Sequence, residues 1–224
     1  MWRPRGDRTP RVGAVFVASP RGLVGAGAAG DPAWVAAVVL LEGRLVESVV
    51  VLGRLDAPYA SGLLALRHGR LLEEAVRSLR VVPDVVIANA TGRDHPRRAG
   101  LAIHLGVACD LPTIGVTDRP LVAMGPDPGT ERGASAALRL EGELVGYRLR
   151  TRPGARAVAV HAGWRVDADT ARELALAVTI RSRTPEPLRQ ARVQARTSRS
   201  AGAGTPPAPP PDAGLSFEAG RSPR

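Results

Sequence analysis

The chain has 224 residues, of which 44% are apolar and 23% are charged. This composition excludes a wholly disordered protein and suits one globular domain of ordinary size. Cys109 is the single cysteine, which excludes an internal disulfide and favours a reducing compartment. The chain contains no run of about 18 apolar residues, the length that could span a membrane. The Arg-rich residues 1–11 have no apolar segment of the signal-peptide type. We therefore expect a cytoplasmic monomer without a membrane segment.

The formal net charge of +10 is distributed unevenly along the chain. Residues 181–224 carry eight Arg and three acidic residues, a net charge of +5, and residues 1–11 add +3. A basic segment can bind a phosphate backbone through the release of counterions. However, the chain has no Lys, and all 31 of its basic side chains are Arg, a bias that is typical of GC-rich genomes. Net charge alone is therefore weak evidence for a nucleic-acid partner.

The hydrophobic pattern predicts strands and helices in a definite order. Apolar runs rich in Val predict strands at residues 11–18, 34–41, 44–52, 84–88, 113–116, 135–140, 144–149 and 157–161. Apolar side chains three and four residues apart predict helices at residues 62–80, 96–109 and 167–180. Three antiparallel strands, two of them joined by a tight Glu42-Gly43 turn, are thus followed by parallel β-α-β units. This order favours an α/β fold of the ribonuclease H-like layout, a mixed sheet flanked by helices.

The chain divides into three parts. Residues 1–10 form a basic N-terminal extension, and residues 11–183 form the folded domain. Residues 184–224 are rich in Pro, Arg and Ala and show no apolar periodicity, so we expect a disordered tail there.

Gly25, Gly27 and Gly30 spell the GxGxxG pattern, which binds dinucleotides when it lies between a strand and a helix. Here Pro20 interrupts the approach to the pattern, and a β-branched run follows it in place of a helix. We therefore interpret residues 19–32 as a flexible loop rather than a nucleotide site.

The six residues His-Pro-Arg-Arg-Ala-Gly that begin at His95 are the most informative part of the chain. Pro96 suits the first turn of the predicted helix, because proline lacks the N–H group that is unpaired there. Arg97 and Arg98 would then lie at a helix N-terminus, where anions are already favoured. The polar residues 89–94 precede them at the carboxyl end of a strand, a position that often carries function. We expect this region to contact a phosphate or another anion; the alternative is a surface loop with two solvated arginines.

These residues resemble the endonuclease V family, the deoxyinosine-directed endonucleases. The matching motifs, all in the same order, are Pro58-Tyr59, Asn89–Leu101, Asp110–Val116, Gly163–Val166 and Asp169–Ala171. The resemblance covers about residues 11–185. It implies a ribonuclease H-like fold, a DNA or RNA partner that contains inosine, and cleavage of a phosphodiester bond with Mg²⁺ held by carboxylates.

The sequence departs from the family pattern at the positions that the resemblance assigns to catalysis. Val15, His68 and Asn89 stand where the family has its three metal-binding carboxylates, and we expect them to lie close together. Asp118 stands where the family has a catalytic lysine, with Arg119 next to it. Valine cannot bind a metal, histidine is a nitrogen ligand that Mg²⁺ does not prefer, and asparagine supplies a neutral oxygen. We therefore expect no metal cofactor, and at Asp118 a negative charge that repels substrate phosphate.

Other positions keep the residue types of the family. The resemblance assigns His95 and Asp169 to the remnant of the catalytic site, and Tyr59, Gly92, Arg97 and Arg98 to nucleic-acid binding. Tyr59 lies in the loop that the family uses as a wedge.

Three functions remain open at this point. The first, which the retained motifs favour, is a nucleic-acid-binding protein of this fold that no longer cleaves. The second is an active nuclease with a reorganised site that holds a softer metal such as Mn²⁺ or Zn²⁺ through His68, Asp94, His95, Asp118 and Asp169. The third is a protein-interaction scaffold that acts through its Pro- and Arg-rich tail.

Overall fold

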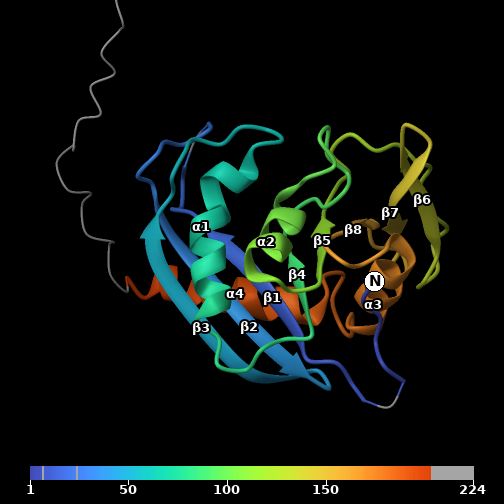
Figure 1. The fold of residues 1–224 in the computed structure, drawn as a ribbon, viewed down its shortest axis with the longest axis horizontal. Coiled ribbons are helices and arrows are strands. Elements are labelled where there is room, and N and C mark those ends of the chain that lie inside the picture. The colour runs from blue at the N-terminus through green and yellow to red at the C-terminus, as the bar shows by residue number, and fades with distance from the viewer. Residues whose placement is uncertain (7, 24, 203–224) are drawn as a thin grey trace, which may run out of the picture.

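The computed structural model describes residues 1–6, 8–23 and 25–202, which form an eight-stranded mixed sheet with helices on both faces (Figure 1). The strand order is β3-β2-β1-β4-β5-β8-β7-β6. The strands are β1 (Val12–Ala18), β2 (Pro32–Leu41), β3 (Arg44–Arg54), β4 (Val85–Ala88), β5 (Thr113–Thr117), β6 (Ser135–Leu140), β7 (Glu143–Leu149) and β8 (Val158–Ala162). The helices are α1 (Leu64–Arg77), α2 (Leu101–Cys109), α3 (Ala168–Ala177) and α4 (Glu186–Ser200). The predicted α/β class, of ribonuclease H-like layout, is confirmed.

The pairing of the central strands determines where the sheet can carry a site. β1 is antiparallel to β2 but parallel to β4, and β4 is parallel to β5. The carboxyl ends of β1, β4 and β5 therefore meet at one edge of the sheet, toward which the arrows of β4 and β5 point upward in Figure 1. Polar loops at such an edge are a common place for function in sheets of this kind.

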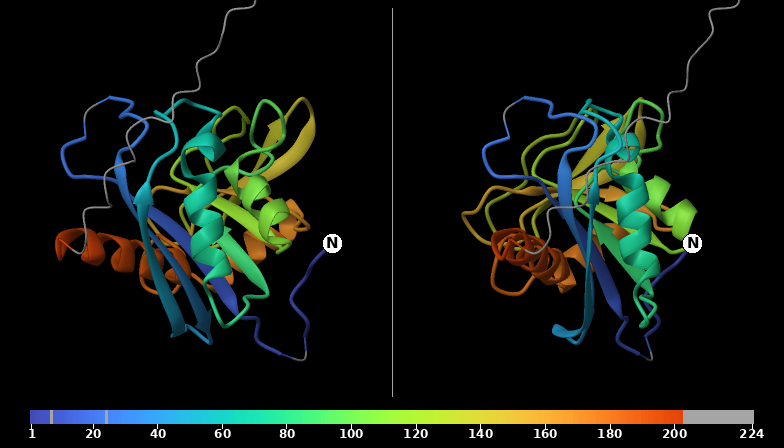
Figure 2. Two further views of the ribbon diagram at one scale, coloured as in Figure 1. Left: turned by 60° about the vertical axis from the view of Figure 1, so that its left-hand side comes forward. Right: turned by 90° about the vertical axis from the view of Figure 1, so that its left-hand side faces the viewer.

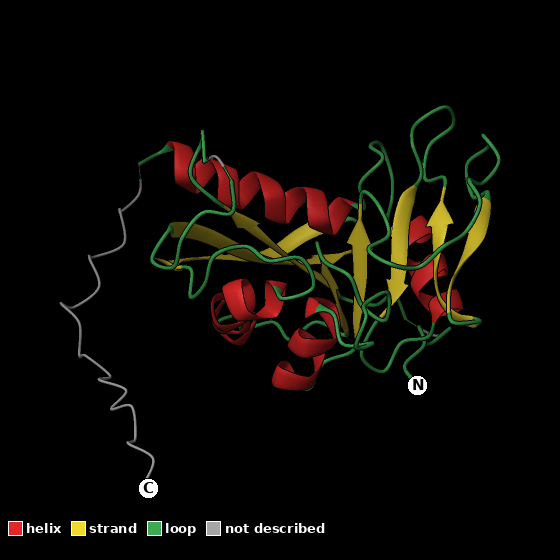
Figure 3. Ribbon diagram, turned by 90° about the horizontal axis from the view of Figure 1, so that it is seen from above, coloured by secondary structure: helices red, strands yellow, loops and turns green. Residues whose placement is uncertain are grey.

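Helices cover both faces of the sheet, so its central strands are apolar throughout. Leu71 of α1 and Leu105 of α2 are buried on one face, and Leu174 of α3 and Leu188 of α4 are buried on the other. Figures 2 and 3 show α4 on the side of the sheet opposite α1 and α2. None of the helices in the described parts of the chain is both long and apolar enough to cross a membrane.

Helix α4 lies where we expected a disordered tail, so that expectation is wrong for residues 186–200. Leu188, Ala191 and Ala195 are fully buried where the helix crosses β1 and β2. The small alanines let the helix backbone approach the sheet closely, so a narrow apolar stripe suffices to hold it. That stripe is hard to recognise in the sequence because arginines surround it. Residues 203–224, the rest of the expected tail, lie outside the described residues.

The basic N-terminal extension is attached to the domain. The N–H group of Trp2 donates to the carbonyl of Arg165 at 2.6 Å. Arg8 and Arg11 form ion pairs with Asp84 at 2.9 and 3.2 Å. Part of the positive charge of this segment is therefore neutralised within the fold.

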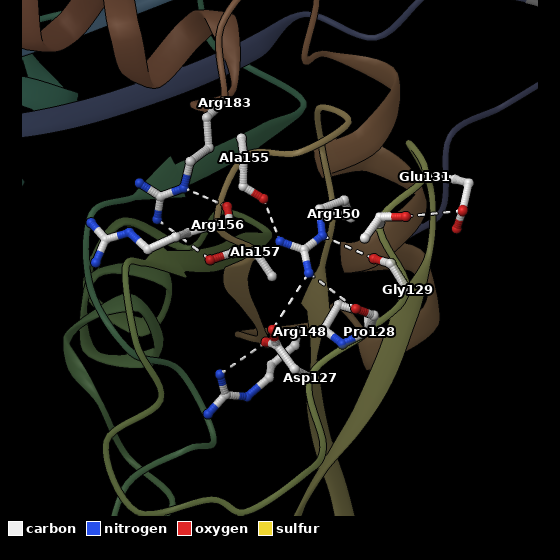
Figure 4. A network of polar contacts seen from close by, with 11 residues as sticks. Asp127, Pro128, Gly129, Glu131, Arg148, Arg150, Ala155, Arg156, Ala157 and Arg183 are labelled. Atoms are coloured by element: carbon white, nitrogen blue, oxygen red, sulfur yellow. Dashed lines mark hydrogen bonds and ion pairs between the residues drawn. The ribbon is translucent and has the colours of Figure 1, made fainter.

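A buried arginine organises the insertion that carries β6 and β7 (Figure 4). The Nε atom of Arg150 donates to the carbonyl of Gly129 at 2.9 Å. Its Nη2 atom donates to the carbonyl of Pro128 at 3.0 Å, and its Nη1 atom donates to the carbonyl of Ala155. The Nη2 atom also forms an ion pair with the carboxylate of Asp127 at 3.4 Å. The donors of this guanidinium are occupied by loop carbonyls, so they are not available to an external phosphate.

The substitution Leu188→Ala tests whether α4 belongs to the folded core. Leu188 is 1% exposed, so we expect the substitution to lower the free energy of unfolding by about 2–5 kcal/mol, the usual cost of such a cavity. The matched control is Val193→Ala on the exposed side of the same helix, for which we expect a change within about 0.5 kcal/mol. Urea denaturation measures both, and equal small effects would contradict the packing of α4.

Candidate nucleic-acid site

Two adjoining cavities open at the edge where β1, β4 and β5 end. The inner cavity has a volume of about 110 Å³ and lies between β1, the end of β4 and α1. The outer cavity has a volume of about 210 Å³ and lies between the loops that follow β3, β4 and β5. The two cavities share the lining residues Leu64, Asn89, Ala90 and Leu101. A ligand in one cavity would therefore contact walls that also form the other.

The inner cavity brings together Val15, His68 and Asn89. Val15 on β1 is paired with Ala88, the last residue of β4, so Asn89 follows directly beside it. His68 completes the group from α1. The parallel pairing of β1 with β4 thus unites positions that are far apart along the chain.

His68 is a neutral group in this cavity. Its Nε2 atom is buried and has no hydrogen-bond partner. Burial, assisted by the positive charge of Arg67, lowers the pKa of His68 to about 4. Arg67 is itself buried against Asp31 at 3.0 Å and the carbonyl of Ala28 at 3.2 Å, which ties the Gly-rich loop to α1. The imidazole is therefore unprotonated at neutral pH.

The outer cavity contains an aromatic rim and a buried histidine. Tyr59 is 52% exposed, and its N–H group donates to the carbonyl of Ala26 at 2.8 Å. The Nε2 atom of His95 lies 2.7 Å from the carbonyl of Gly62 and donates to it. The Nδ1 atom of His95 accepts from the N–H group of Arg97 at 3.1 Å. Backbone groups thus contact both ring nitrogens, so His95 fixes the loop in place.

The predicted helix start at Pro96 is wrong. Helix α2 begins at Leu101 with Gly100 as its N-cap residue. Arg98 has a φ angle of +54°, in the left-handed region that a right-handed helix excludes. The arginines of this motif therefore lie in a compact loop before the helix rather than in its first turn.

The two arginines of the motif have different surroundings. The guanidinium of Arg98 is half-buried and binds Glu141 at 3.0 Å and Glu143 at 3.6 Å, which attaches the loop to the β6–β7 hairpin. The side chain of Arg97 is exposed and makes no ion pair with the residues that the structure describes. Of the pair, Arg97 is the one available to an anion.

Gly92 lies where this loop touches β8. A Cβ atom at Gly92 would lie 2.0 Å from the carbonyl oxygen of Ala162, so only glycine fits. The N–H group of Arg93 donates to the same carbonyl at 2.9 Å, and the N–H group of Gly100 donates to Gly92 at 3.0 Å. Gly92 therefore lets the loop pack directly on the sheet.

Asp94 joins two walls of the outer cavity. Its carboxylate is fully buried and accepts N–H bonds from Leu121, Val122 and Ala123 at 2.6, 2.9 and 2.7 Å. Three such bonds satisfy acceptor oxygens that burial has removed from water. They also hold the loop after β5 against the loop after β4, so the shape of the outer cavity depends on this side chain.

His161 on β8 lies behind Asp94 and is fully buried. Its Nε2 atom donates to the hydroxyl of Thr117 at 2.8 Å, because that hydroxyl gives its own proton to the carbonyl of Arg119 at 2.7 Å. Its Nδ1 atom lies 3.6 Å from Asp94. Burial lowers the pKa of His161 to about 4, and the charge of Asp94 only partly offsets this effect. Sequence reasoning missed this proximity of Asp94 to His161, because only the sheet order brings the two residues together.

Comparisons with known proteins decide the family. The family model for Endonuclease V matches residues 24–193. The chain belongs to the endonuclease V family. Endonuclease V from Nocardia farcinica is 44% identical over 188 residues, which are 79% of this chain and 83% of that protein.

Solved endonuclease V structures share the fold described above. The crystal structure from Streptomyces avermitilis has a TM-score of 0.78 and 37% identity, and the match covers 88% of this chain and 84% of that one. Endonuclease V from Ciona intestinalis, solved in complex with a 24mer DNA containing an inosine followed by a ribo-adenosine, has a TM-score of 0.72, with 88% of each chain covered. At 21% identity, the second likeness shows the fold alone.

The Mg²⁺ that the endonuclease V family implies does not fit the inner cavity. Mg²⁺ requires several oxygen ligands, usually with one or two carboxylates among them. Val15 has no donor atom, His68 offers a nitrogen and Asn89 offers one neutral oxygen. Among the described residues, no group of three or more His, Cys, Asp or Glu side chains could hold a metal ion. The softer-metal cluster considered above is therefore not assembled in that part of the chain either.

Two acidic residues that the resemblance singled out line neither cavity. Asp169 is exposed in the first turn of α3, where it accepts from the hydroxyl of Tyr147 at 2.8 Å. Asp118 forms an ion pair with Arg183 at 2.6 Å. Arg119, the next residue, lines the outer cavity instead. Within the described residues, the charge of Asp118 is thus paired with Arg183, and Arg119 is the charged side chain that lines the outer cavity.

The substitution His68→Leu tests the buried, neutral state of this imidazole. At pH 8, His68 is neutral in both the folded and the unfolded chain. As the pH falls toward 4, the unfolded chain binds a proton that the folded protein excludes, so the wild type loses stability. Relative to His68→Leu, we expect this loss to reach roughly 2 kcal/mol at pH 5. Urea denaturation at pH 8 and pH 5 measures the difference, and a constant difference would contradict the burial of His68.

Proposed function

We propose that this protein binds nucleic acid that contains inosine through the two cavities and does not cleave it. The inner cavity carries the proposal, because Val15, His68 and Asn89 lie together there and none of them is negatively charged. The adjoining outer cavity keeps an aromatic rim, a cation and a polar loop. The inner cavity thus lacks the negative charge that would hold a metal ion, whereas the outer cavity keeps side chains that can bind a base. This combination favours binding of nucleic acid over its hydrolysis.

The outer cavity supplies the contacts that a displaced nucleobase needs. A base that leaves its stack is held by stacking on aromatic side chains and by hydrogen bonds to its edge. Tyr59 offers an aromatic face, and Asn89 and Thr91 offer donors and acceptors. Arg119 on the wall and the exposed Arg97 supply positive charge for flanking phosphates. The Ciona intestinalis protein, which shares this fold, was solved with inosine-containing DNA, and our proposal extends that class of ligand to this chain.

The inner cavity lacks the charge that hydrolysis of a phosphodiester needs. Metal-dependent cleavage stabilises the attacking and leaving oxygens through an ion that carboxylates hold in place. The lining residues of both cavities include no Asp or Glu in the part of the chain that the structure describes. Arg119 can attract a phosphate, but it cannot replace the missing ligands.

The first prediction of this proposal concerns base recognition. We expect Tyr59→Ala to lower the affinity for an inosine-containing single strand roughly tenfold, since stacking one base contributes about 1–3 kcal/mol. Affinity for the same strand without inosine should change little. Fluorescence anisotropy with labelled oligonucleotides measures both.

The other tyrosine of the chain is the matched control. Tyr147 bonds Asp169 away from both cavities, so Tyr147→Ala should leave the inosine preference within about twofold of the wild type. Equal affinities of the wild type for the two strands, unchanged by Tyr59→Ala, would remove the base-binding cavity from the proposal.

The second prediction concerns cleavage. We expect the wild type to leave inosine-containing DNA and RNA intact in the presence of Mg²⁺. The triple variant Val15→Asp, His68→Glu, Asn89→Asp restores the three carboxylates around the inner cavity, and Arg119 already supplies the cation. We expect this variant to bind Mg²⁺ in calorimetry and to nick inosine-containing strands on denaturing gels, whereas Asn89→Asp alone should rescue little.

A neutral variant of the same shape separates charge from disruption of the cavity. Val15→Asn with His68→Gln keeps Asn89 and adds no carboxylate, so it should neither bind Mg²⁺ nor cleave. Cleavage by the wild type with Mg²⁺ would show that a different active site exists and that the proposal is wrong.

A further inference from the structure

The exposed side of α4 carries a row of arginines over a shallow groove. The groove has a volume of about 350 Å³ and is lined by Arg189, Arg192, Val193, Arg196, Thr197 and Ser200. Guanidinium and hydroxyl groups of this kind are the side chains that most often bind phosphate in nucleic-acid complexes. The apolar side of the same helix is buried in the core, so this face is the one left to solvent.

Most of these arginines lack an acidic partner. Arg189 is paired with Glu186 at 2.5 Å. Arg192, Arg196 and Arg199 form no ion pair with any residue that the structure describes; Asp118 acts on Arg192 only at longer range and is itself bound to Arg183. We call Arg192, Arg196 and Arg199, together with Arg21, the α4 arginine patch. Arg21 reaches it from the loop after β1 by donating to the hydroxyl of Ser200 at 2.9 Å.

The patch is held in place rather than freely solvated. The guanidinium groups of Arg192 and Arg196 stack over the ring of Phe16, at 5.3 and 5.8 Å from its centre. Arg199 donates to the carbonyl of Ser19 at 2.9 Å. The Nε atoms of Arg192 and Arg199 are nevertheless buried without a hydrogen-bond partner. Cations that are already held by such contacts can bind an anion at little cost in side-chain entropy.

Strand β1 links the patch to the candidate site. Alternate residues of a strand point to opposite faces of the sheet. Val15 and Val17 accordingly belong to the apolar core on the α1 side, whereas Phe16 between them belongs to the core on the α4 side, under the arginines. All three residues also line the inner cavity. Patch and cavity therefore lie at the same end of β1, on opposite faces of the sheet.

We propose that the α4 arginine patch binds the phosphodiester backbone of a nucleic-acid strand, independently of base identity. The proposal deepens the proposed function by adding a second contact surface outside the cavities, and it rests on that function only for the identity of the polyanion. An anionic membrane fits less well, since a membrane-binding helix needs an exposed apolar face, and Leu188, Ala191 and Ala195 of α4 are buried.

The test compares two double variants of the full chain. Arg192→Gln with Arg196→Gln removes two cations of the patch and leaves the apolar face of α4 intact. Arg44→Gln with Arg152→Gln removes two exposed cations that have no ion pair in the described residues and lie on other elements. Circular dichroism verifies that both variants are folded, and anisotropy measures binding to one labelled single strand, with and without inosine, over a range of salt concentrations.

We expect the α4 variant to lose about tenfold in affinity at moderate salt, equally for both strands, and its salt slope to fall by about 1.4, or about 0.7 per lost phosphate contact. The control variant should keep the slope of the wild type. An α4 variant that behaves like the control, or one that loses binding to phosphatidylglycerol vesicles but keeps its affinity for the oligonucleotide, would overturn the proposal.

The test of the α4 arginine patch can be distinguished from the test of base binding in the cavities. Tyr59→Ala should change the ratio of affinities for the two strands and leave the salt slope unaltered, whereas the α4 variant should do the reverse. If the wild type shows no preference for inosine, the cavity proposal fails, and a reduced slope in the α4 variant still supports the patch.

Discussion

The buried carboxylate of Asp94 is the interaction on which the outer cavity depends. It accepts three backbone N–H bonds from residues 121–123 and lies against His161 of β8. A buried charge is stable only when its oxygens are fully bonded, so this group can hold the surrounding loops in essentially one arrangement. The position of the loop that carries His95, and of the wall that carries Arg119, follows from that arrangement.

Strand β1 borders two surfaces of different character, one on each face of the sheet. On the α1 side, its end borders a cavity that brings together the uncharged side chains of Val15, His68 and Asn89. On the α4 side, Phe16 supports stacked guanidinium groups that lack acidic partners. The first face is suited to an uncharged group such as a base, and the second is suited to phosphate. Both arrangements agree with the binding of nucleic acid that we propose.

The arginines of this chain show why net charge is a poor guide to binding. Arg150 and Arg67 are buried and bonded to loop carbonyls, and Arg98 is neutralised by two glutamates. These side chains act as structural cross-links in a protein without lysine, since a planar guanidinium can satisfy several carbonyls at once. Exposed arginines without an ion pair in the described residues, such as Arg97 and Arg196 of the α4 arginine patch, are the ones that remain for an external anion.

The sequence by itself determined the α/β class, the order of the elements and the family, because apolar periodicity and ordered motifs are local properties of the chain. It also predicted that Val15, His68 and Asn89 lie close together, and all three line the inner cavity. The tertiary structure alone decided that Asp118 pairs with Arg183, that Arg98 is paired with two glutamates, and that Asp94 lies beside His161. Each of these depends on pairing between distant strands and loops. Helix α4 also could not be predicted from the sequence alone. Its narrow stripe of buried alanines is recognisable as a packing surface only when the sheet that it covers is known.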